Sequence, residues 1–212
     1  METKNTIPLW LAVAITVVVS LPFGIWLGKL NFPLWAAFIV WAEYFALGAK
    51  PSILKNMVPA YVLGVVGGAI ICEVYAALSK VFGSGTVVDF SLQQLTNDNA
   101  ALYIAFFVGF CVLIYAMKWM PVNGAWSLPF FNGVSVFLGV FFTGSVVSGS
   151  ALGWFNDFGF SADVALYWNI AFSAIAAIMG GLLGAFLGWF NIVILFPRPV
   201  SKSNVVEQPA RS

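Results

Sequence analysis

The sequence predicts an all-α membrane protein in which six transmembrane helices form a 3+3 inverted repeat, with both chain ends in the cytoplasm. The 212 residues are 61% hydrophobic and only 8% charged, with a mean hydropathy of +0.97. Soluble proteins are about a quarter charged. The apolar segments reach the roughly 20 residues that a bilayer span requires. Residues that mark the first half of the chain also recur in the second half.

Six apolar segments in order divide the chain. They cover residues 7–29, 32–49, 56–82, 99–120, 126–148 and 164–196. We therefore predict a first three-helix repeat, an outer connecting loop, a second three-helix repeat and a disordered cytoplasmic tail, over residues 1–82, 83–98, 99–196 and 197–212. Pro197 and Pro199 stop the last helix. The Gly- and Ser-rich segment 144–162 either forms an ordinary outer loop or re-enters the membrane.

Two asparagines and two glycine pairs indicate the repeat. Asn56 precedes Gly67-Gly68 by eleven residues, and Asn169 precedes Gly180-Gly181 by the same spacing. Small residues follow at every fourth position, namely Ala60, Gly64, Gly68 and Cys72, then Ser173, Ala177, Gly181 and Ala185. Such a stripe lets another helix approach closely. We predict helix packing at Gly64, Gly67, Gly68, Gly180, Gly181 and Gly184.

A second pair of markers precedes each copy. Pro33 leads by fifteen residues to Gly48, and Pro129 leads by fifteen to Gly144. Each half holds three helices, an odd number, so the second half enters the membrane from the opposite side and the repeat is inverted. This architecture is common in transporters and channels, which place a site near the midplane between the halves. A purely structural repeat is the alternative interpretation.

The distribution of Lys and Arg predicts the orientation, because cytoplasmic segments near a membrane are enriched in them. With the N-terminus inside, the inner segments hold seven of the nine basic residues, namely Lys4, Lys50, Lys55, Lys118, Arg198, Lys202 and Arg211. The outer segments hold Lys29 and Lys80. Both termini are therefore predicted to be cytoplasmic.

Two carboxylates lie well inside the predicted spans. Glu43 follows Pro33 by ten residues, about 15 Å along a helix, which places it near the bilayer centre. A carboxylate there is costly, so Glu43 should face the bundle interior or water, or be protonated. It either lines a solute path or acts as a protonated hydrogen-bond partner between helices. Glu73 lies near the outer surface and is interpreted as an interfacial residue.

Polar and aromatic residues complete the predicted path. Asn56 and Asn169 begin the two glycine-striped helices, where each is interpreted as an N-cap or as a polar group at one mouth of the path. Asn132 is a third candidate. Two aromatic pairs at helical spacing, Trp41 with Phe45 and Phe137 with Phe141, either constrict the path or pack against the glycine stripes.

Several function classes are excluded or unsupported. The chain has no histidine, so it offers no His-containing metal or haem site, and we expect neither a metal nor a cofactor. Cys72 and Cys111 lie in apolar runs and are interpreted as small buried hydrophobic residues. No nucleotide-binding loop or catalytic triad pattern occurs, so we expect no enzyme. The net charge of +1 gives no support for nucleic-acid binding.

The segment FPLWAAFIVWAEYFALGA, at residues 32–49, precedes the helix of Gly67-Gly68. With it, the chain resembles a bacterial inner-membrane family of unknown function, family DUF1097. The resemblance rests on the second span, rich in Trp and Phe, and its closing glycine, and it implies no substrate. The three-plus-three arrangement is also similar, at the level of architecture alone, to that of the proton-gated urea channels, whose protomers form rings.

These features predict a channel or facilitator for a small neutral or weakly charged solute, with its path between the two inverted repeats. One alternative is a proton- or cation-coupled secondary transporter that uses Glu43. Another is a non-transporting component that only assembles in the membrane through its glycine stripes. We expect a multi-pass protein of the cell inner membrane that contacts lipid, binds a small solute or ion and forms a homo-oligomer.

Overall fold

The computed structural model describes residues 3–27, 33–81, 100–119, 126–146, 162–195 and 197–199. Its six α-helices are α1 Leu9–Leu27, α2 Leu34–Ala46, α3 Leu54–Val81, α5 Ala100–Ala116, α6 Ser127–Val146 and α8 Ala162–Ile194. Two 3-10 helices, Pro51–Ile53 and Met117–Trp119, and two three-residue strands, β1 Thr3–Asn5 and β2 Pro197–Pro199, complete the described elements. The predicted all-α class is confirmed, because one α-helix covers most of each predicted apolar segment.

Three of the helical stretches are long and apolar enough to cross a membrane, namely Pro51–Val81, Ala101–Trp119 and Tyr167–Ile194. Shorter apolar stretches cover Leu9–Gly24, Leu34–Ala46 and Ser127–Phe142. With 13 residues, α2 is about 20 Å long, whereas the hydrocarbon core of a bilayer is about 30 Å thick. The described fold is thus compatible with a membrane protein, and the number of full spans stays a prediction.

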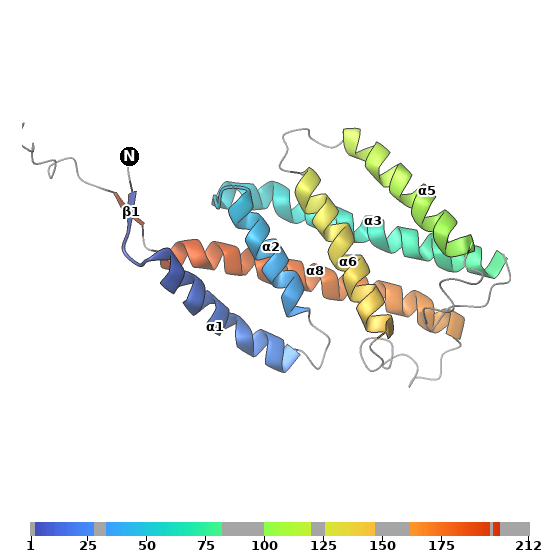
Figure 1. Ribbon diagram of the computed structural model, residues 1–212, viewed down its shortest axis with the longest axis horizontal. Helices are drawn as coiled ribbons and strands as arrows, with labels where there is room; N and C mark the ends of the chain where they lie inside the picture. Colours follow the sequence, from blue (N-terminus) through green and yellow to red (C-terminus); the bar gives the residue numbers. More distant parts are fainter. Residues whose placement is uncertain are drawn as a thin grey trace, which may run out of the picture.

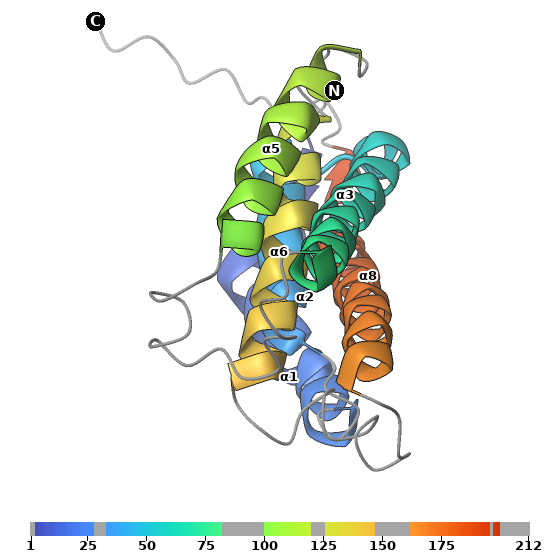
Figure 2. The same ribbon diagram turned by 90° about the vertical axis from the view of Figure 1, so that its right-hand side faces the viewer.

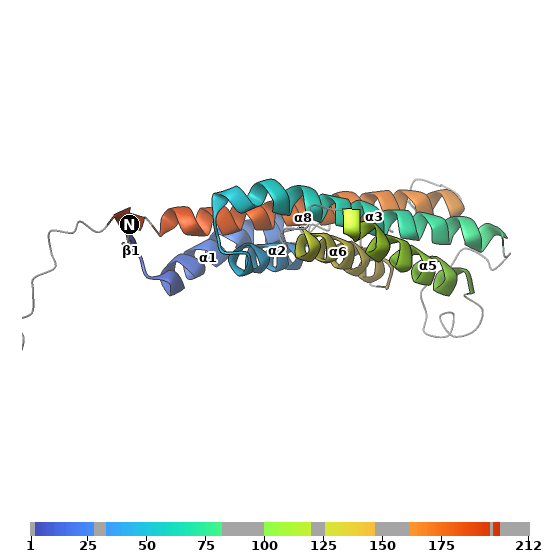
Figure 3. The same ribbon diagram turned by 90° about the horizontal axis from the view of Figure 1, so that it is seen from above.

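The helices form two layers. The long helices α3 and α8 lie in one layer, and α1, α2, α6 and α5 lie in the other (Figures 2 and 3). Figure 1 shows that α3 and α8 run in opposite directions, and that α2 and α6 cross them, also in opposite directions. The most extensive contacts join α3 to α6 and α2 to α8. Each long helix therefore packs chiefly on a short helix from the other half of the chain.

The α3–α6 contact brings two backbones together at glycines. A Cβ built at Gly64 would overlap the carbonyl oxygen of Phe130, and one built at Gly133 would overlap that of Tyr61. No side chain larger than hydrogen fits between the helices there. Gly133, which the sequence analysis did not select, is thus as essential to this crossing as Gly64.

The α2–α8 contact uses the same principle with different residues. A Cβ built at Gly184 would overlap the carbonyl oxygen of Ala37, and one built at Gly180 would lie 3.0 Å from the Ala36 Cβ. The stripe that faces α2 therefore runs through Gly180 and Gly184. Gly181, one residue on, faces the ring of Tyr61 on α3 instead.

The remaining predicted packing glycines also lie at helix contacts. A Cβ at Gly67 would lie 3.0 Å from Leu113 Cδ2 on α5, and a Cβ at Gly68 would lie 2.7 Å from Phe137 Cδ1 on α6. The two positions are adjacent in sequence but serve two different neighbours, because successive residues of a helix point about 100° apart.

The end of α2 is fixed by a glycine in the left-handed region. Gly48 has φ +100°, and its N–H donates to the Phe45 carbonyl over 2.9 Å. The N–H of Ala49 donates to the Tyr44 carbonyl, also over 2.9 Å. These two bonds form a Schellman motif, in which glycine is the preferred residue. The motif holds the last turns of α2, including Glu43, in a defined position before the chain turns into α3.

The two asparagines interpreted as N-caps lie inside their helices, so this interpretation is wrong. The helix α3 begins at Leu54, two residues before Asn56, because Pro51 already starts a helical turn after the extended Lys50. The helix α8 begins at Ala162, seven residues before Asn169, since its apolar sequence continues upstream. Both side chains are therefore free for other contacts.

The two ends of the described chain are paired. Strand β1 runs antiparallel to β2, with Thr3 opposite Pro199 and Lys4 opposite Arg198. The expectation of disorder from residue 197 onward is thus wrong for residues 197–199, because these three residues find a partner strand. Residues 200–212, the loop 83–98 and most of segment 144–162 lie outside the described residues, so the other predictions made for them stay predictions.

Candidate functional site

Glu43 lies buried in the middle of the bundle. It is on α2, three residues before the helix ends, and only 3% of its surface is exposed. Neither carboxylate oxygen has a hydrogen-bond partner in the described part of the chain. The side chain of Asn132, from α6, faces the carboxyl group. Glu43 therefore points into the protein, away from lipid, as the sequence analysis required of a costly buried acid.

Tyr61 extends this group of polar side chains to two more helices. The tyrosine is on α3, and its side chain lies near the carboxyl group of Glu43. Its hydroxyl donates a hydrogen bond of 2.9 Å to the carbonyl oxygen of Ala177 on α8, and its ring packs against Gly181. We call Glu43, Tyr61 and Asn132 the central polar group. Its members come from α2, α3 and α6, and Tyr61 links the group to the backbone of α8 near the middle of that helix.

The two aromatic pairs occupy different places. The rings of Phe137 and Phe141 are stacked, 6.0 Å apart and tilted by 11°, within the main core. The rings of Trp41 and Phe45 lie 6.5 Å apart in a separate cluster with Leu187, towards α1. The structure therefore does not bring the pairs together across one path. Phe137 and Phe141 share a core with Tyr61, and Trp41 does not.

The three asparagines also differ in their surroundings. Asn132 is half-buried beside Glu43, whereas Asn56 is exposed on the first turn of α3. Asn169 is buried, and its Oδ1 atom accepts no hydrogen bond from the described residues. Only Asn132 thus joins the central polar group.

Sequence analysis missed several buried polar residues. They are Tyr61, Tyr75 and Ser79 on α3, and Ser173 on α8, which was selected only as a small packing residue. The spacing offered a signal, since Tyr61 and Ser79 are eighteen residues apart and return to the same face of a helix. We call Tyr75, Ser79, Asn169 and Ser173 the polar seam.

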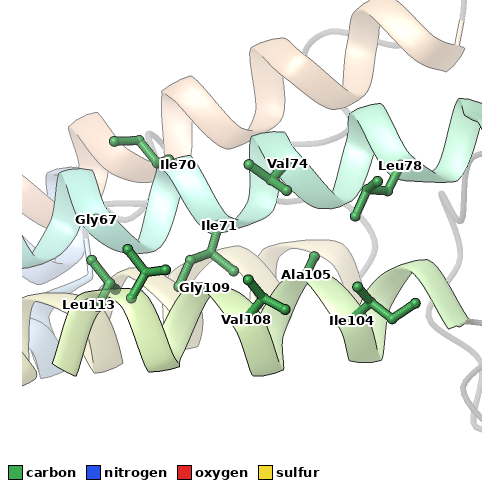
Figure 4. A pocket seen from close by; sticks show the side chains of 11 residues that line it. Gly67, Ile70, Ile71, Val74, Leu78, Ile104, Ala105, Val108, Gly109 and Leu113 are labelled. Carbon is green, nitrogen blue, oxygen red and sulfur yellow. The ribbon is translucent and has the colours of Figure 1, made fainter. Parts of the chain in front are cut away.

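A cavity of about 280 Å³ lies elsewhere, between α3 and α5. Figure 4 shows its apolar walls, with Ile70, Ile71 and Val74 from α3 facing Ala105, Val108 and Gly109 from α5. None of the predicted path residues lines it. A wall of hydrocarbon offers no hydrogen bond to a polar solute, so this cavity is not a candidate for the polar site.

An all-α fold with three helices of bilayer-spanning length, and a carboxylate held between its central helices, is compatible with a membrane protein. A model of a protein family matches residues 6–111, which include α1, α2, α3 and most of α5. The chain belongs to this family, described as protein of unknown function (DUF1097), as the resemblance predicted. Searches of curated proteins and of solved structures gave no match.

Proposed function

We propose that this protein is a channel or facilitator for a small neutral or weakly charged solute, with a path that passes the central polar group. The observation that carries the proposal is the position of Glu43. Its carboxyl group is buried between α2, α3 and α6, with the Asn132 side chain beside it and no cationic side chain near it among the described residues, and neither of its oxygens has a hydrogen bond within 3.5 Å. Buried polar groups normally have partners, so a permeating solute or water is expected to supply them.

The arrangement of the helices supports the inverted repeat that we propose for the membrane. In this repeat α1 corresponds to α5, α2 to α6 and α3 to α8. The contact of α3 with α6 then corresponds to the contact of α8 with α2, and these are the two most extensive contacts in the bundle. The strands β1 and β2 bring both chain ends to one end of the bundle, as an even number of crossings requires. The excess of Lys and Arg assigns that end to the cytoplasm.

We also propose a homo-oligomer in the inner membrane. Only 17% of the apolar window of α5 is buried, compared with 50% for each of the other two long stretches. Exposed apolar side chains along α5 include Phe107 and Val112. Of the three long stretches, the one that contains α5 therefore has the largest share of its surface available to lipid or to a second copy.

A second candidate function is coupled transport. Glu43 is the one acidic residue among the buried polar side chains of the described chain. A carboxyl group can bind and release a proton or a cation at each turnover, so this single acid suffices for coupling. The third interpretation, a component that only assembles, predicts no flux.

The experiment uses the purified full-length chain in liposomes. Stopped-flow measurements follow the uptake of water, urea, glycerol and ammonium, with and without a pH or sodium gradient. Uptake above that of empty liposomes, without dependence on a gradient, supports a channel. Uptake that requires a gradient supports the coupled transporter instead. Uptake equal to that of empty liposomes for the whole panel contradicts both.

A further inference from the structure

The polar seam lies apart from the central polar group, along the half of α3 that follows it. Tyr75, Ser79, Asn169 and Ser173 each expose at most 2% of their surface. The Ser79 side chain lies beside the Tyr75 hydroxyl, but its own hydroxyl donates to the Tyr75 carbonyl over 2.9 Å. Within 3.5 Å, neither the Tyr75 hydroxyl nor the Asn169 Oδ1 has a hydrogen-bond partner in the described part of the chain. An unpaired donor and an unpaired acceptor are thus buried in the same region.

Two contacts between α3 and α8 flank the stretch in which the four residues lie. Tyr61 contacts Ala177 at one end of the stretch, and the Lys80 Nζ lies 4.8 Å above the ring of Tyr167 at the other. The helices α3 and α8 are antiparallel (Figure 1), so the stretch of α8 between Tyr167 and Ala177 runs alongside the stretch of α3 between Tyr61 and Lys80. On the third side, α6 contributes Phe141 to the same core as Tyr75.

The seam carries no charge of its own. The charged residues nearest to the seam in sequence are Glu73 and Lys80. Tyr61 and Ser79 share one face of α3, and at 100° per residue Glu73 lies about 120° and Lys80 about 100° around the helix from that face. Glu73 is half-buried there and Lys80 is exposed. The groups that remain are hydroxyls, a carboxamide and aromatic rings, which bind neutral molecules by hydrogen bonds and have no charge to offer an anion.

The opposite end of the interior is different. There the buried side chains of Val40, Met57 and Ala185 belong to the main core together with Tyr44. Near the end of α8, the buried Asn191 donates a hydrogen bond of 2.9 Å from its Nδ2 atom to the Thr16 hydroxyl on α1. Ala60 occupies the position in α3 that Ser173 occupies in α8, counted from Asn56 and Asn169. The two helices therefore differ at this matched buried position, which holds a hydroxyl in α8 and a methyl group in α3.

We propose that the polar seam is a second binding position for a small neutral solute with both hydrogen-bond donors and acceptors, reached from the end of the bundle at which α8 begins. The unpaired Tyr75 hydroxyl donates to the solute and the Asn169 Oδ1 accepts from it. This inference rests on the proposed function for its role in transport, but it is tested by chemical access, which does not depend on flux.

The test compares two single cysteines at equivalent positions. In full-length protein with Cys72→Ala and Cys111→Ala, Ser173→Cys probes the seam and Ala60→Cys is the matched control, since both positions are buried. N-ethylmaleimide in liposomes is expected to modify Ser173→Cys at least about tenfold faster than Ala60→Cys, because opening free energies differ widely between regions of a protein. Urea, as a neutral probe with donors and acceptors, should slow the modification of Ser173→Cys only.

The outcomes separate this inference from the proposed function. Equal rates for the two cysteines, or a faster Ala60→Cys, overturn the seam whatever the flux. A reactive Ser173→Cys that urea does not protect overturns the binding position. A protected Ser173→Cys in a protein without flux supports the seam and contradicts the proposed channel. Ser79→Cys provides a second probe if Ser173→Cys does not fold, as judged by its elution in detergent.

Discussion

The two ends of the interior are built on the same arrangement of helices but differ in the residues at corresponding positions of α3 and α8. At the start of α8 the buried residues include Asn169 and Ser173, whereas the corresponding positions in α3 hold Asn56, which is exposed, and Ala60. The backbone crossings keep small residues in both halves, because larger ones would separate the helices. The polar residues are under no such constraint. The comparison teaches that the glycines specify the scaffold, and that function is to be sought where the halves differ.

The first prediction concerns the glycines at the crossing of α3 and α6. Gly64→Leu and Gly133→Leu each insert a side chain where two backbones touch, so we expect both to destabilise the fold by more than about 3 kcal/mol, the upper end of ordinary overpacking costs. Fluorescence-detected size-exclusion chromatography in detergent should show loss of the folded peak. Val66→Leu, on the exposed face of the same helix, is the control. A normal peak for Gly64→Leu would show that α3 and α6 are not in contact.

Gly68 and Gly181 test whether glycine is also required where the neighbouring atoms belong to a side chain. Each faces an aromatic ring, Phe137 or Tyr61, and not a backbone. Leu at either position should still abolish stable assembly, because a ring buried on all sides cannot move far. Yield and oligomer size report the result, and normal values for both variants contradict the prediction.

The second prediction concerns sidedness, on which the meaning of the two ends depends. A reporter protein fused after Ser212 should be active only in its cytoplasmic form, because the inner segments hold seven of the nine basic residues. The pairing of β1 with β2 predicts the same side for a reporter fused before Met1. A periplasmic reporter at either end would overturn the proposed topology and exchange the assignment of the two ends.

The third prediction addresses the central polar group between the ends. Glu43→Gln keeps the size of the side chain and removes its charge and its proton, so the fold should survive while flux, or its dependence on pH, changes at least about tenfold. Glu73→Gln is the control, since this half-buried residue is not part of the group. Liposome flux from acid to neutral pH measures both. A Glu43→Gln variant that transports like the parent at every pH reduces Glu43 to a structural role.

Much of the fold could be predicted from the sequence, and less of the site. Apolar segments of bilayer length predict helices, and the pairs Gly67-Gly68 and Gly180-Gly181 predict close helix contacts. Each of these patterns can be recognised within a single segment of the sequence. Gly133 carries no such local signal, and the spacing of Tyr61 from Ser79 indicates a shared helix face without indicating what that face contacts. Their importance arises from the crossing of α3 with α6 and from the Tyr61 contact with α8, which join residues far apart in the chain. The separation of Trp41 from Phe141 has the same origin.

The last prediction compares one hydroxyl group of the central polar group, that of Tyr61, with one of the polar seam, that of Tyr75. Tyr61→Phe removes a buried hydrogen bond of 2.9 Å and leaves the chain otherwise unchanged, so stability should fall by about 1 kcal/mol. For a protein of this size the loss corresponds to roughly 2–4 °C in Tm. Tyr75→Phe removes a hydroxyl that has no partner among the described residues, so its effect on Tm should be near zero or slightly stabilising.

The effects of the two variants on solute binding should have the opposite order to their effects on Tm. Tyr75→Phe removes a donor that we assign to the solute, so protection of Ser173→Cys by urea should weaken, while Tyr61→Phe leaves the seam intact. A loss of Tm in Tyr75→Phe as large as that in Tyr61→Phe would show that the Tyr75 hydroxyl has a partner within the chain. The seam would then be a structural hydrogen-bond network, and its polarity would stabilise the contact of α3 with α8 and bind no solute.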